Sequence, residues 1–259
     1  MGNLIGISGK KQSGKDTVGG IILELTRKRE RRISGLLDKE VEYVGGHTFQ
    51  IKKFADKLKD ITCLLIVCTR EELEDEVFKN TELGEEWWYY KPSDTIYSYL
   101  EYKQHEDQHH GIAIYKEDLI KPTPRLLLQL LGTECGRQII HPSIWVNSLM
   151  NEYRGSESIL WKNGDKTVNS NSYPNWIITD MRFPNELLAV KQRKGISIRV
   201  NTKWKHHTDG KHITAYRENE HESETALDNA EFDYTIYNNG TIEELTEKVK
   251  KILIKENII

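Results

Sequence analysis

Near the N-terminus the sequence reads Ile5-Gly6-Ile7-Ser8-Gly9-Lys10-Lys11-Gln12-Ser13-Gly14-Lys15-Asp16-Thr17, a short apolar run that ends at a glycine. From Gly9 to Lys15 it fits G-x-x-x-x-G-K, the spacing of a phosphate-binding loop. Glycine lets the backbone turn tightly, so that several N–H groups point inward beside the N-terminus of the next helix. Lys15 would reach the β- and γ-phosphates of a nucleotide. The stretch therefore predicts a nucleotide-phosphate site.

The residue after the lysine departs from the usual pattern. That position normally holds Ser or Thr, whose hydroxyl binds Mg²⁺, but here it holds Asp16, and Thr17 follows. Either Asp16 takes a metal or substrate role, or Thr17 supplies the hydroxyl. The alternative to a phosphate site is an ordinary Gly/Lys turn into a helix. The context favours the phosphate site, because a predicted buried strand at 3–8 precedes the loop and a helical apolar pattern at 15–31 follows it.

Length, charge and cysteine usage narrow the class of protein. The chain has 259 residues, which suit one domain with insertions or at most two. The net charge of −3 provides no overall attraction to nucleic acids or membranes. Cys63, Cys68 and Cys135 show no C-x-x-C spacing, which is typical of a reduced cytosolic protein. We see no long apolar run and no signal peptide, so we expect a cytoplasmic protein.

Strands and helices alternate along the chain, which predicts an α/β fold. The predicted strands are 3–8, 48–55, 176–180, 196–200 and 232–237. The predicted helices are 15–31, one that begins at Asp56 with Leu58, Ile61, Leu64 and Leu65 on its apolar side, one capped by Thr69, 123–140, 143–152, one that begins at Pro184 and one capped by Thr241.

Two segments interrupt this alternation. Residues 80–118 contain eight aromatic side chains between Trp87 and Tyr115. They could form a platform for stacking bases, but the acidic residues among them favour a small subdomain that packs on itself, since nucleic-acid grooves are normally basic. Residues 155–175 are predicted to form a surface hairpin around Asn163-Gly164, with a loop at 169–172.

The helix 123–140 carries candidate substrate-binding residues. Arg125, Gln129, Gly132 and Gly136 recur at helical spacing and share one face. Because glycine destabilises a helix interior by about 1 kcal/mol relative to alanine, two glycines indicate that something approaches this face closely. Tight packing against a neighbouring helix is the alternative to a bound ligand.

Two later segments carry groups suited to phosphate chemistry. Asp180 ends a buried strand, where an acid can hold Mg²⁺ or polarise the attacking group, and Arg182 follows within reach of a phosphate. The segment 202–228 is rich in Lys, Arg and His, with Arg217 among them. We expect it to act as a lid that closes over phosphates, with a plain solvated loop as the alternative.

Several motifs together resemble one family, the phage deoxynucleoside monophosphate kinases within the adenylate-kinase-like phosphate-loop group. The motifs are Ser8-Gly9…Ser13-Gly14-Lys15-Asp16-Thr17, Phe54-Ala55-Asp56-Lys57-Leu58-Lys59, Pro124-Arg125…Leu128-Gln129…Leu131-Gly132-Thr133-Glu134, Asp180-Met181-Arg182-Phe183-Pro184-Asn185-Glu186, His221-x-Ser223-Glu224 and Asp233-Tyr234…Asn239-Gly240-Thr241. The resemblance implies a single domain over 1–259 with a five-stranded parallel sheet and flanking helices, plus the lid and the two inserts. It also implies Mg²⁺-dependent transfer of the ATP γ-phosphate to a dNMP, a phage origin and action in the infected bacterial cytoplasm.

The same resemblance implies roles for individual residues. Catalytic roles fall to Lys15, Asp16, Arg137, Asp180 and Arg182. The ATP phosphates would be held by Gly9, Lys10, Ser13, Gly14, Lys15 and Thr17, and the adenine would be bordered by Asn239, Gly240 and Thr241. The dNMP would be bound by Lys57, Arg125, Gln129, Arg137, Trp145 and Arg217. Mg²⁺ would be bound by Asp16, Thr17 and Asp180.

Two other functions stay open from the sequence. One is a related kinase that acts on a modified base within phage DNA, which would need a basic groove that the net charge of −3 does not favour. The other is a non-catalytic module that binds a nucleotide to set a conformation, which would not need a second nucleotide pocket. For the kinase we expect no nucleic-acid or membrane partner. A homodimer is possible, since dimers are common among soluble proteins.

Overall fold

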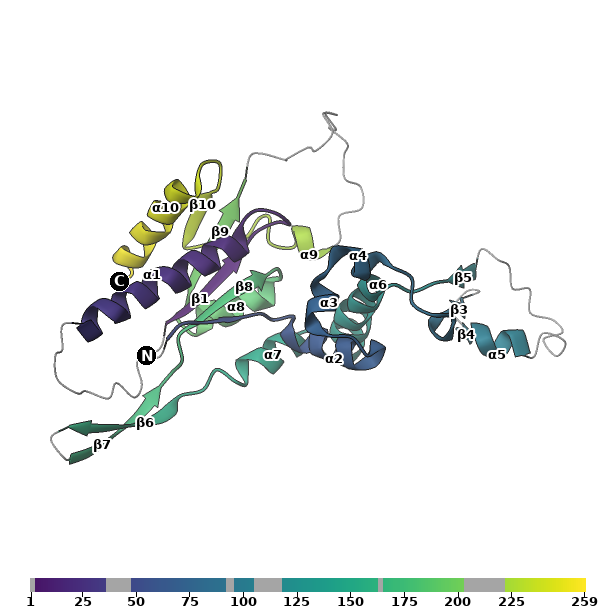
Figure 1. The fold of residues 1–259 in the computed structure, drawn as a ribbon, viewed down its shortest axis with the longest axis horizontal. Coiled ribbons are helices and arrows are strands. Elements are labelled where there is room, and N and C mark those ends of the chain that lie inside the picture. The colour runs from purple at the N-terminus through teal and green to yellow at the C-terminus, as the bar shows by residue number, and fades with distance from the viewer. Residues whose placement is uncertain (1–2, 36–47, 92–95, 105–117, 163–164, 203–221) are drawn as a thin grey trace. The chain divides into compact units, whose positions relative to one another are not determined.

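The computed structural model describes residues 3–35, 48–91, 96–104, 118–162, 165–202 and 222–259 (Figure 1). The chain divides into two compact units, which we describe separately. The first unit comprises Met1–Phe54 and Val146–Ile259, and the second comprises Ala55–Trp145.

A five-stranded parallel sheet forms the centre of the first unit, as the sequence predicts. Its strand order is β10-β9-β1-β8-β2. The strands are β1 Leu4–Ser8, β2 Gln50–Lys52, β8 Trp176–Met181, β9 Ile196–Asn201 and β10 Tyr234–Tyr237. The chain places β2 and β8 on one side of β1 and then β9 and β10 on the other. This change of direction at β1 creates a switch point, where ligands bind beyond the carboxyl ends of the strands.

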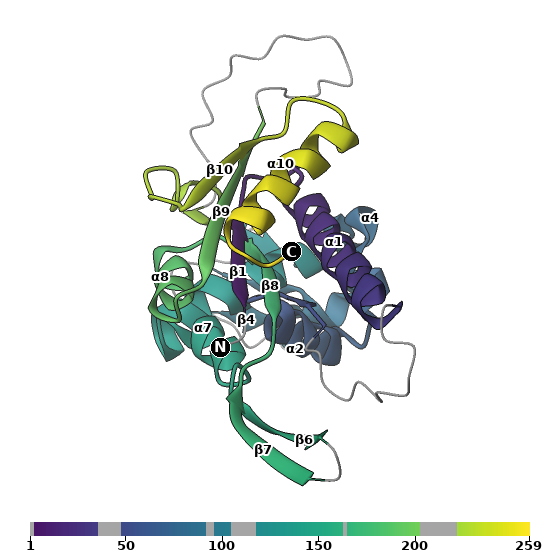
Figure 2. The same ribbon diagram turned by 90° about the vertical axis from the view of Figure 1, so that its left-hand side faces the viewer.

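Helices cover both faces of this sheet. They are α1 Lys15–Gly35, α7 Ile144–Met150, α8 Pro184–Gln192, the short α9 Glu222–Thr225 and α10 Ile242–Lys255. Figure 2 shows α1 and α10 side by side on one face. Alternate residues of β1 point to opposite faces: Ile5 and Ile7 pack with residues of α1 and α10, whereas Leu4 packs with residues of α7 and α8. All five residues of β1 are buried, as expected for a central parallel strand.

A hairpin extends from the first unit where the sequence predicts one. It pairs β6 Ser156–Lys162 with β7 Asp165–Ser172 in antiparallel register. The prediction of a loop at 169–172 is wrong, because these residues continue β7 and Ser172 pairs with Ser156. Polar Asn and Ser residues have low strand propensity, but cross-strand backbone pairing overrides it here.

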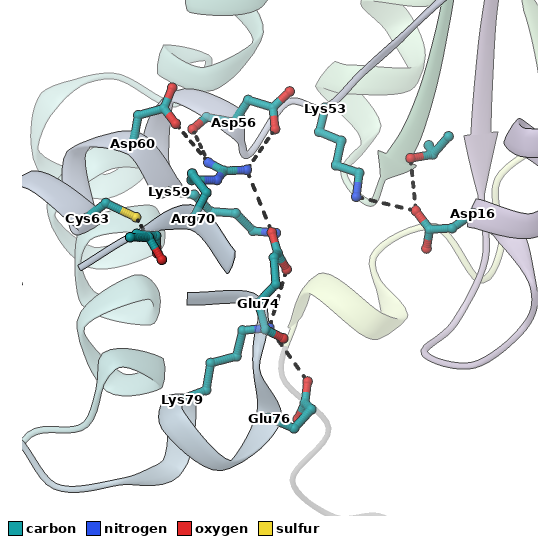
Figure 3. Close-up of polar contacts among 12 residues, drawn as sticks. Asp16, Lys53, Asp56, Lys59, Asp60, Cys63, Arg70, Glu74, Glu76 and Lys79 are labelled. Carbon is teal, nitrogen blue, oxygen red and sulfur yellow. Dashed lines mark hydrogen bonds and ion pairs between the residues drawn. The ribbon is translucent and has the colours of Figure 1, made fainter. Parts of the chain in front are cut away.

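The second unit combines short helices with a small antiparallel sheet. Its elements are α2 Asp56–Ile66, α3 Arg70–Glu74, α4 Glu76–Asn80, a 3-10 helix Glu85–Trp87, β3 Tyr89–Tyr90, β4 Tyr97–Ser98, α5 Tyr99–Gln104, β5 Leu119–Ile120, α6 Pro124–Gln129 and a π-helix Leu130–Ile140. The predicted capping box at Thr69 and the predicted cap at Thr123 are both present. Arg70 ties α2 to α3 through Asp56 and Asp60 (Figure 3).

The aromatic insert packs on itself in its described part. Its strands form a sheet in the order β4-β3-β5. The ring centroids of Trp88 and Tyr99 lie 5.5 Å apart, and those of Tyr90 and Tyr102 lie 5.1 Å apart. These distances suit edge-on or tilted ring contacts, which stabilise a small cluster. Residues 92–95 and 105–117 of the insert lie outside the described residues.

Three further predictions from the sequence need correction. The second strand is shorter than 48–55, since only Gln50–Lys52 pair with β8. On α2, Leu64 is 81% exposed, and Ile61 and Leu65 are also exposed, because Thr62 and Cys63 lie on the buried side instead.

The third correction concerns the helix 123–140. From Leu130 onward it is a π-helix, with more than the 3.6 residues per turn of an α-helix, so the single-face argument fails beyond Gln129. The neighbours of its glycines are the protein's own side chains. A Cβ atom at Gly132 would lie 2.9 Å from Leu58 Cδ2, and one at Gly136 would lie 2.9 Å from Trp145 Cζ2. The alternative of tight packing therefore accounts for both glycines.

Among the described residues, no helix combines the length and the apolar character that a membrane span requires.

The two kinds of helical glycine predict opposite effects on stability. At Gly136 an alanine Cβ would lie 2.5 Å from the Leu131 carbonyl oxygen, whereas at Gly20 in α1 no atom lies within 4 Å. We expect Gly136→Ala to lower the free energy of unfolding by about 1–3 kcal/mol through overpacking. Gly20→Ala should raise it by about 0.5–1 kcal/mol. Calorimetric unfolding of the full chain tests both variants, and a stabilising Gly136→Ala would contradict the packing.

Candidate active site

The loop between β1 and α1 has the backbone geometry of an anion-binding turn. The Ser13 N–H donates to the Lys10 carbonyl at 3.1 Å, which closes the turn. Gln12 and Gly14 have φ angles of 64° and 90°. Gly14 is required for a second reason, because a Cβ there would lie 2.4 Å from Asn238 Nδ2. The segment that the sequence predicts to bind phosphate is thus tightly folded.

A buried hydroxyl lies inside this loop. Ser13 is 1% exposed, and its Oγ is the one buried side-chain polar atom without a hydrogen-bond partner across the described ranges. Gly9 makes room for it, since a Cβ at Gly9 would lie 2.3 Å from Ser13 Oγ. Buried polar groups are nearly always hydrogen-bonded in folded proteins, so an orphaned hydroxyl at a loop suggests a ligand oxygen as its partner.

Asn238, the residue directly after β10, holds the loop through a hydrogen bond. Its Nδ2 donates to the Ser13 carbonyl at 3.0 Å, and its backbone N–H donates to the Asn201 carbonyl at 2.7 Å. Thr241 accepts from the Glu244 N–H and caps α10, as predicted. The segment after β10 therefore contacts the loop through Asn238. The residues predicted from the sequence to lie beside the nucleotide are the three that follow, 239–241.

Asp16 lies among positive charges. Its carboxylate is 3.5 Å from Lys15 Nζ and accepts from the Thr179 hydroxyl at 3.1 Å. It also lies 3.5 Å from Lys53 Nζ (Figure 3). Burial acts to raise the pKa of Asp16, but the two lysines and the Thr179 hydroxyl outweigh it, so the pKa lies below its usual value. Asp16 is therefore a carboxylate at neutral pH. The stability that its contacts supply is present above pH 3.8 and is lost as the pH falls through the lowered pKa.

Asp180 and Arg182 lie at the carboxyl end of β8, which pairs with β1. Asp180 Oδ1 accepts the Phe54 N–H at 2.8 Å. The Arg182 guanidinium donates to Glu224, and the other oxygen of Glu224 accepts the Lys11 N–H of the loop at 2.9 Å. These contacts bring the predicted acid and the predicted phosphate-binding arginine to the strand end beside the loop.

The donor set at the loop fits a magnesium ion shared with a nucleotide. The described residues contain no group of three or more His, Cys, Asp or Glu side chains that could hold a metal by themselves. Mg²⁺ is usually bound through one or two carboxylates together with substrate phosphates. The ionised Asp16, with the exposed Thr17 next to it, offers the hard oxygen ligands that such a shared ion needs.

A family model described as deoxynucleotide monophosphate kinase matches residues 3–249. The chain belongs to this family. It is 26% identical over 214 residues to the deoxynucleoside-5′-monophosphate kinase of Escherichia phage T5. The aligned region covers 72% of this chain and 70% of that protein. The protein is a deoxynucleoside monophosphate kinase, a phosphotransferase of nucleotide metabolism.

The predicted dNMP-binding residues of this kinase belong mainly to the second unit. There Arg125 donates to Glu76 at 2.7 Å and to Asn80 at 2.9 Å, while Lys57 and Gln129 are exposed. Arg137 is partly buried in the π-helix. The predicted lid residue Arg217 lies outside the described residues.

Trp145 has a supporting role in the second unit. It is 6% exposed, and its Nε1 donates to the Gly132 carbonyl at 2.9 Å. Its ring also packs against Gly136. This burial favours a structural role over the direct substrate contact that the sequence suggests.

Several residues contact the loop although the sequence does not predict these contacts. Among them, Lys53, Glu224 and Asn238 each bind a group between residues 11 and 16. Lys53 and Asn238 follow directly after strands of the parallel sheet, so the rule that ligands bind at carboxyl strand ends could have found them. Glu224 belongs to the motif His221-x-Ser223-Glu224, but nothing in the sequence indicates which group it binds.

Lys53 is expected to control the charge state of Asp16. Lys53→Met removes one of the two positive charges and should raise the Asp16 pKa. The neighbouring Lys52→Met is a matched control, because Lys52 pairs with Glu152 and lies over the Trp176 ring. NMR titration of the Asp16 carboxyl carbon measures both. An unchanged pKa in Lys53→Met, or an equal rise in both variants, would show that the Lys53–Asp16 contact does not form in solution.

Proposed function

We propose that this kinase transfers the γ-phosphoryl group of Mg²⁺-bound ATP to the α-phosphate of a dNMP, with its phosphate-binding loop holding ATP. The observation that carries the proposal is the arrangement at Lys15–Thr17: an ionised Asp16 between two lysines, beside a folded loop with an orphaned Ser13 hydroxyl. A binding module that only senses a nucleotide would not need this convergence of cations on one carboxylate.

The donor side of the reaction is assigned to the first unit. Backbone groups of Gly9, Lys10, Ser13 and Gly14 would hold the phosphates, and Lys15 would contact the transferring group. Its side chain is only 12% exposed, which restricts its conformations before ATP binds. Asn239, Gly240 and Thr241 would border the adenine, next to the Asn238 contact with the loop.

Asp16, Thr17 and Asp180 would hold Mg²⁺ together with the ATP phosphates. The ion would supply neutralisation of the charge that develops on the transferred group. The chain's own part is to keep Asp16 ionised and correctly placed, which Lys15, Lys53 and Thr179 accomplish. Asp180 is held by the Phe54 N–H.

The acceptor side is assigned to the second unit and the lid. Lys57, Arg125, Gln129 and Arg137 would bind the dNMP, with Trp145 as a buried support and Arg217 as the lid cation. The Arg125 pair with Glu76 would have to rearrange or share its guanidinium when a phosphate arrives, and a guanidinium has enough donors for both partners.

The chemistry requires positioning more than acid–base catalysis. A dNMP phosphate oxygen is already ionised near neutral pH, so no strong general base is needed, and it attacks the γ-phosphorus in line with the leaving ADP oxygen. Lys15, Arg137 and Arg182 would neutralise the negative charge on the transferring group. The likeness to a phage enzyme supports action in an infected bacterial cytoplasm, with free dNMPs as substrates and no nucleic-acid partner. A homodimer is a further possibility.

A coupled ADP-release assay tests the reaction. The full chain is given Mg-ATP with dAMP, dGMP, dCMP, dTMP or 5-hydroxymethyl-dCMP in turn. We expect ADP to form only when a monophosphate is present, and Lys15→Ala to lower kcat by about 10²–10³-fold, the cost of losing a preorganised donor. The control Lys250→Ala removes a lysine on the surface of α10 that pairs with Glu247 and should leave kcat unchanged.

Two results would oppose the proposal. ADP release independent of any monophosphate would indicate an ATPase. No turnover with any of the five monophosphates would contradict the proposal and would favour an acceptor base within DNA.

A further inference from the structure

One carboxylate joins the arginine of the site to the phosphate-binding loop. Glu224 Oε1 accepts from Arg182 Nη1, and Glu224 Oε2 accepts the Lys11 backbone N–H at 2.9 Å. Among the described residues, Glu224 is the one partner of the Arg182 guanidinium. The Lys11 N–H of the loop therefore donates to Glu224 in this structure.

The backbone of Arg182 is fixed independently of this contact. The buried Glu186 accepts the N–H groups of Arg182 and Phe183 through one oxygen, at 2.6 and 3.0 Å. The Glu186 contacts stop at the backbone N–H groups. They therefore do not restrict the several rotatable bonds of the long arginine side chain. Glu224 supplies the missing constraint at the far end of the side chain.

The carboxylate of Glu224 is charged at neutral pH. Burial acts to raise its pKa, but Arg182, the Lys11 N–H and Lys15 outweigh this effect and hold the pKa below its usual value. Its side chain is 21% exposed and that of Arg182 is 30% exposed, so the pair is partly shielded from solvent. Charge-assisted hydrogen bonds in such a setting are short and directional.

A second carboxylate from the same segment supports the docking. Asp228 lies 3.1 Å from Lys10 Nζ and 2.8 Å from Arg199 Nη2. Arg199 Nη1 in turn donates to Ser8 Oγ, at the end of β1. Residues 224–228 therefore attach to both ends of the Ser8–Lys11 stretch, which gives Glu224 a fixed base from which to hold Arg182.

We infer that Glu224 is a positioning residue for phosphoryl transfer: by binding the Arg182 guanidinium and the Lys11 N–H at once, it holds Arg182 at the distance from the loop that the transferring phosphate requires. The inference rests on the proposed function, because Arg182 is the group that touches the phosphate there. A guanidinium has five N–H donors, so binding one carboxylate oxygen leaves donors for a phosphate. The contact acts before substrate binds, which reduces the ordering that the transition state would otherwise need.

Two alternative roles for Glu224 predict results that differ from those of a positioning residue. A carboxylate that occupies the phosphate position would compete with ATP, so its removal would lower KM for ATP. A carboxylate that only stabilises the fold would change the unfolding temperature and leave kcat unaltered. A positioning residue should change kcat, with little effect on KM for ATP, and only while Arg182 is present.

A double-mutant cycle tests the inference in the full chain. The variants are Glu224→Gln, Arg182→Gln and both together, with Glu224→Asp as a conservative variant. Glu231→Gln is the matched control, because it neutralises an exposed acid seven positions along the same segment. For each protein kcat and the KM values for ATP and the best dNMP are measured, together with the unfolding temperature.

We expect Glu224→Gln to lower kcat by about 10–100-fold, as for partners that orient a ligand-binding side chain. KM for ATP should change by less than about threefold on the same reasoning. In the Arg182→Gln background the substitution should have almost no further effect. Glu224→Asp should recover part of the activity, and Glu231→Gln should match the wild type. Equal effects of Glu224→Gln in both backgrounds, a lower KM for ATP, or an unchanged kcat would each overturn the inference.

A second measurement does not depend on kinase activity. The Nη–Hη resonances of Arg182, identified by their absence in Arg182→Gln, should be sharp and protected from exchange in the wild type and averaged in Glu224→Gln, because Nη1 is the donor to Glu224. If wild-type protein shows no dNMP-dependent turnover, the proposed function fails, while these resonances still report whether Glu224 holds Arg182. An Arg182 signal unaffected by Glu224→Gln would refute the positioning role.

Discussion

The close packing of the loop between β1 and α1 is the constraint on which the site depends. Gly9 faces the Ser13 hydroxyl and the Val200 carbonyl, and Gly14 faces the Asn238 amide, at distances that exclude any Cβ. The loop is therefore clamped between β9 and the turn after β10. This clamping fixes its N–H groups in advance, so that binding energy is not spent on ordering them.

Two carboxylates near this loop each contact cationic side chains or backbone donors. Asp16 lies between Lys15 and Lys53, and Glu224 lies between Arg182 and the Lys11 N–H. Each carboxylate has its pKa lowered by cations that a nucleotide phosphate would also attract. The two carboxylates thus hold these cations close to the loop.

The sequence predicted local features well and long-range contacts poorly. The strand, loop and helix at 4–35 follow from glycine spacing and apolar periodicity, which act over a few residues. The partners of the loop could not be read this way, since Glu224 and Asn238 lie 213 and 225 positions from the groups they bind. By spacing alone, Gly132 and Gly136 fit either a ligand-facing surface or tight packing, because nothing in the sequence indicates the π-helix or the Trp145 ring beside it.

The central claim is that the loop-bound ATP gives its γ-phosphoryl group directly to a dNMP. The most direct test uses ATP that carries ¹⁸O at the three non-bridging γ-oxygens, with mass spectrometry of all products. We predict that the three labelled oxygens appear together in the β-phosphate of the dNDP, since the acceptor oxygen comes from the dNMP itself. Label recovered in inorganic phosphate, with the dNMP unchanged, would contradict the account, because water would then be the acceptor.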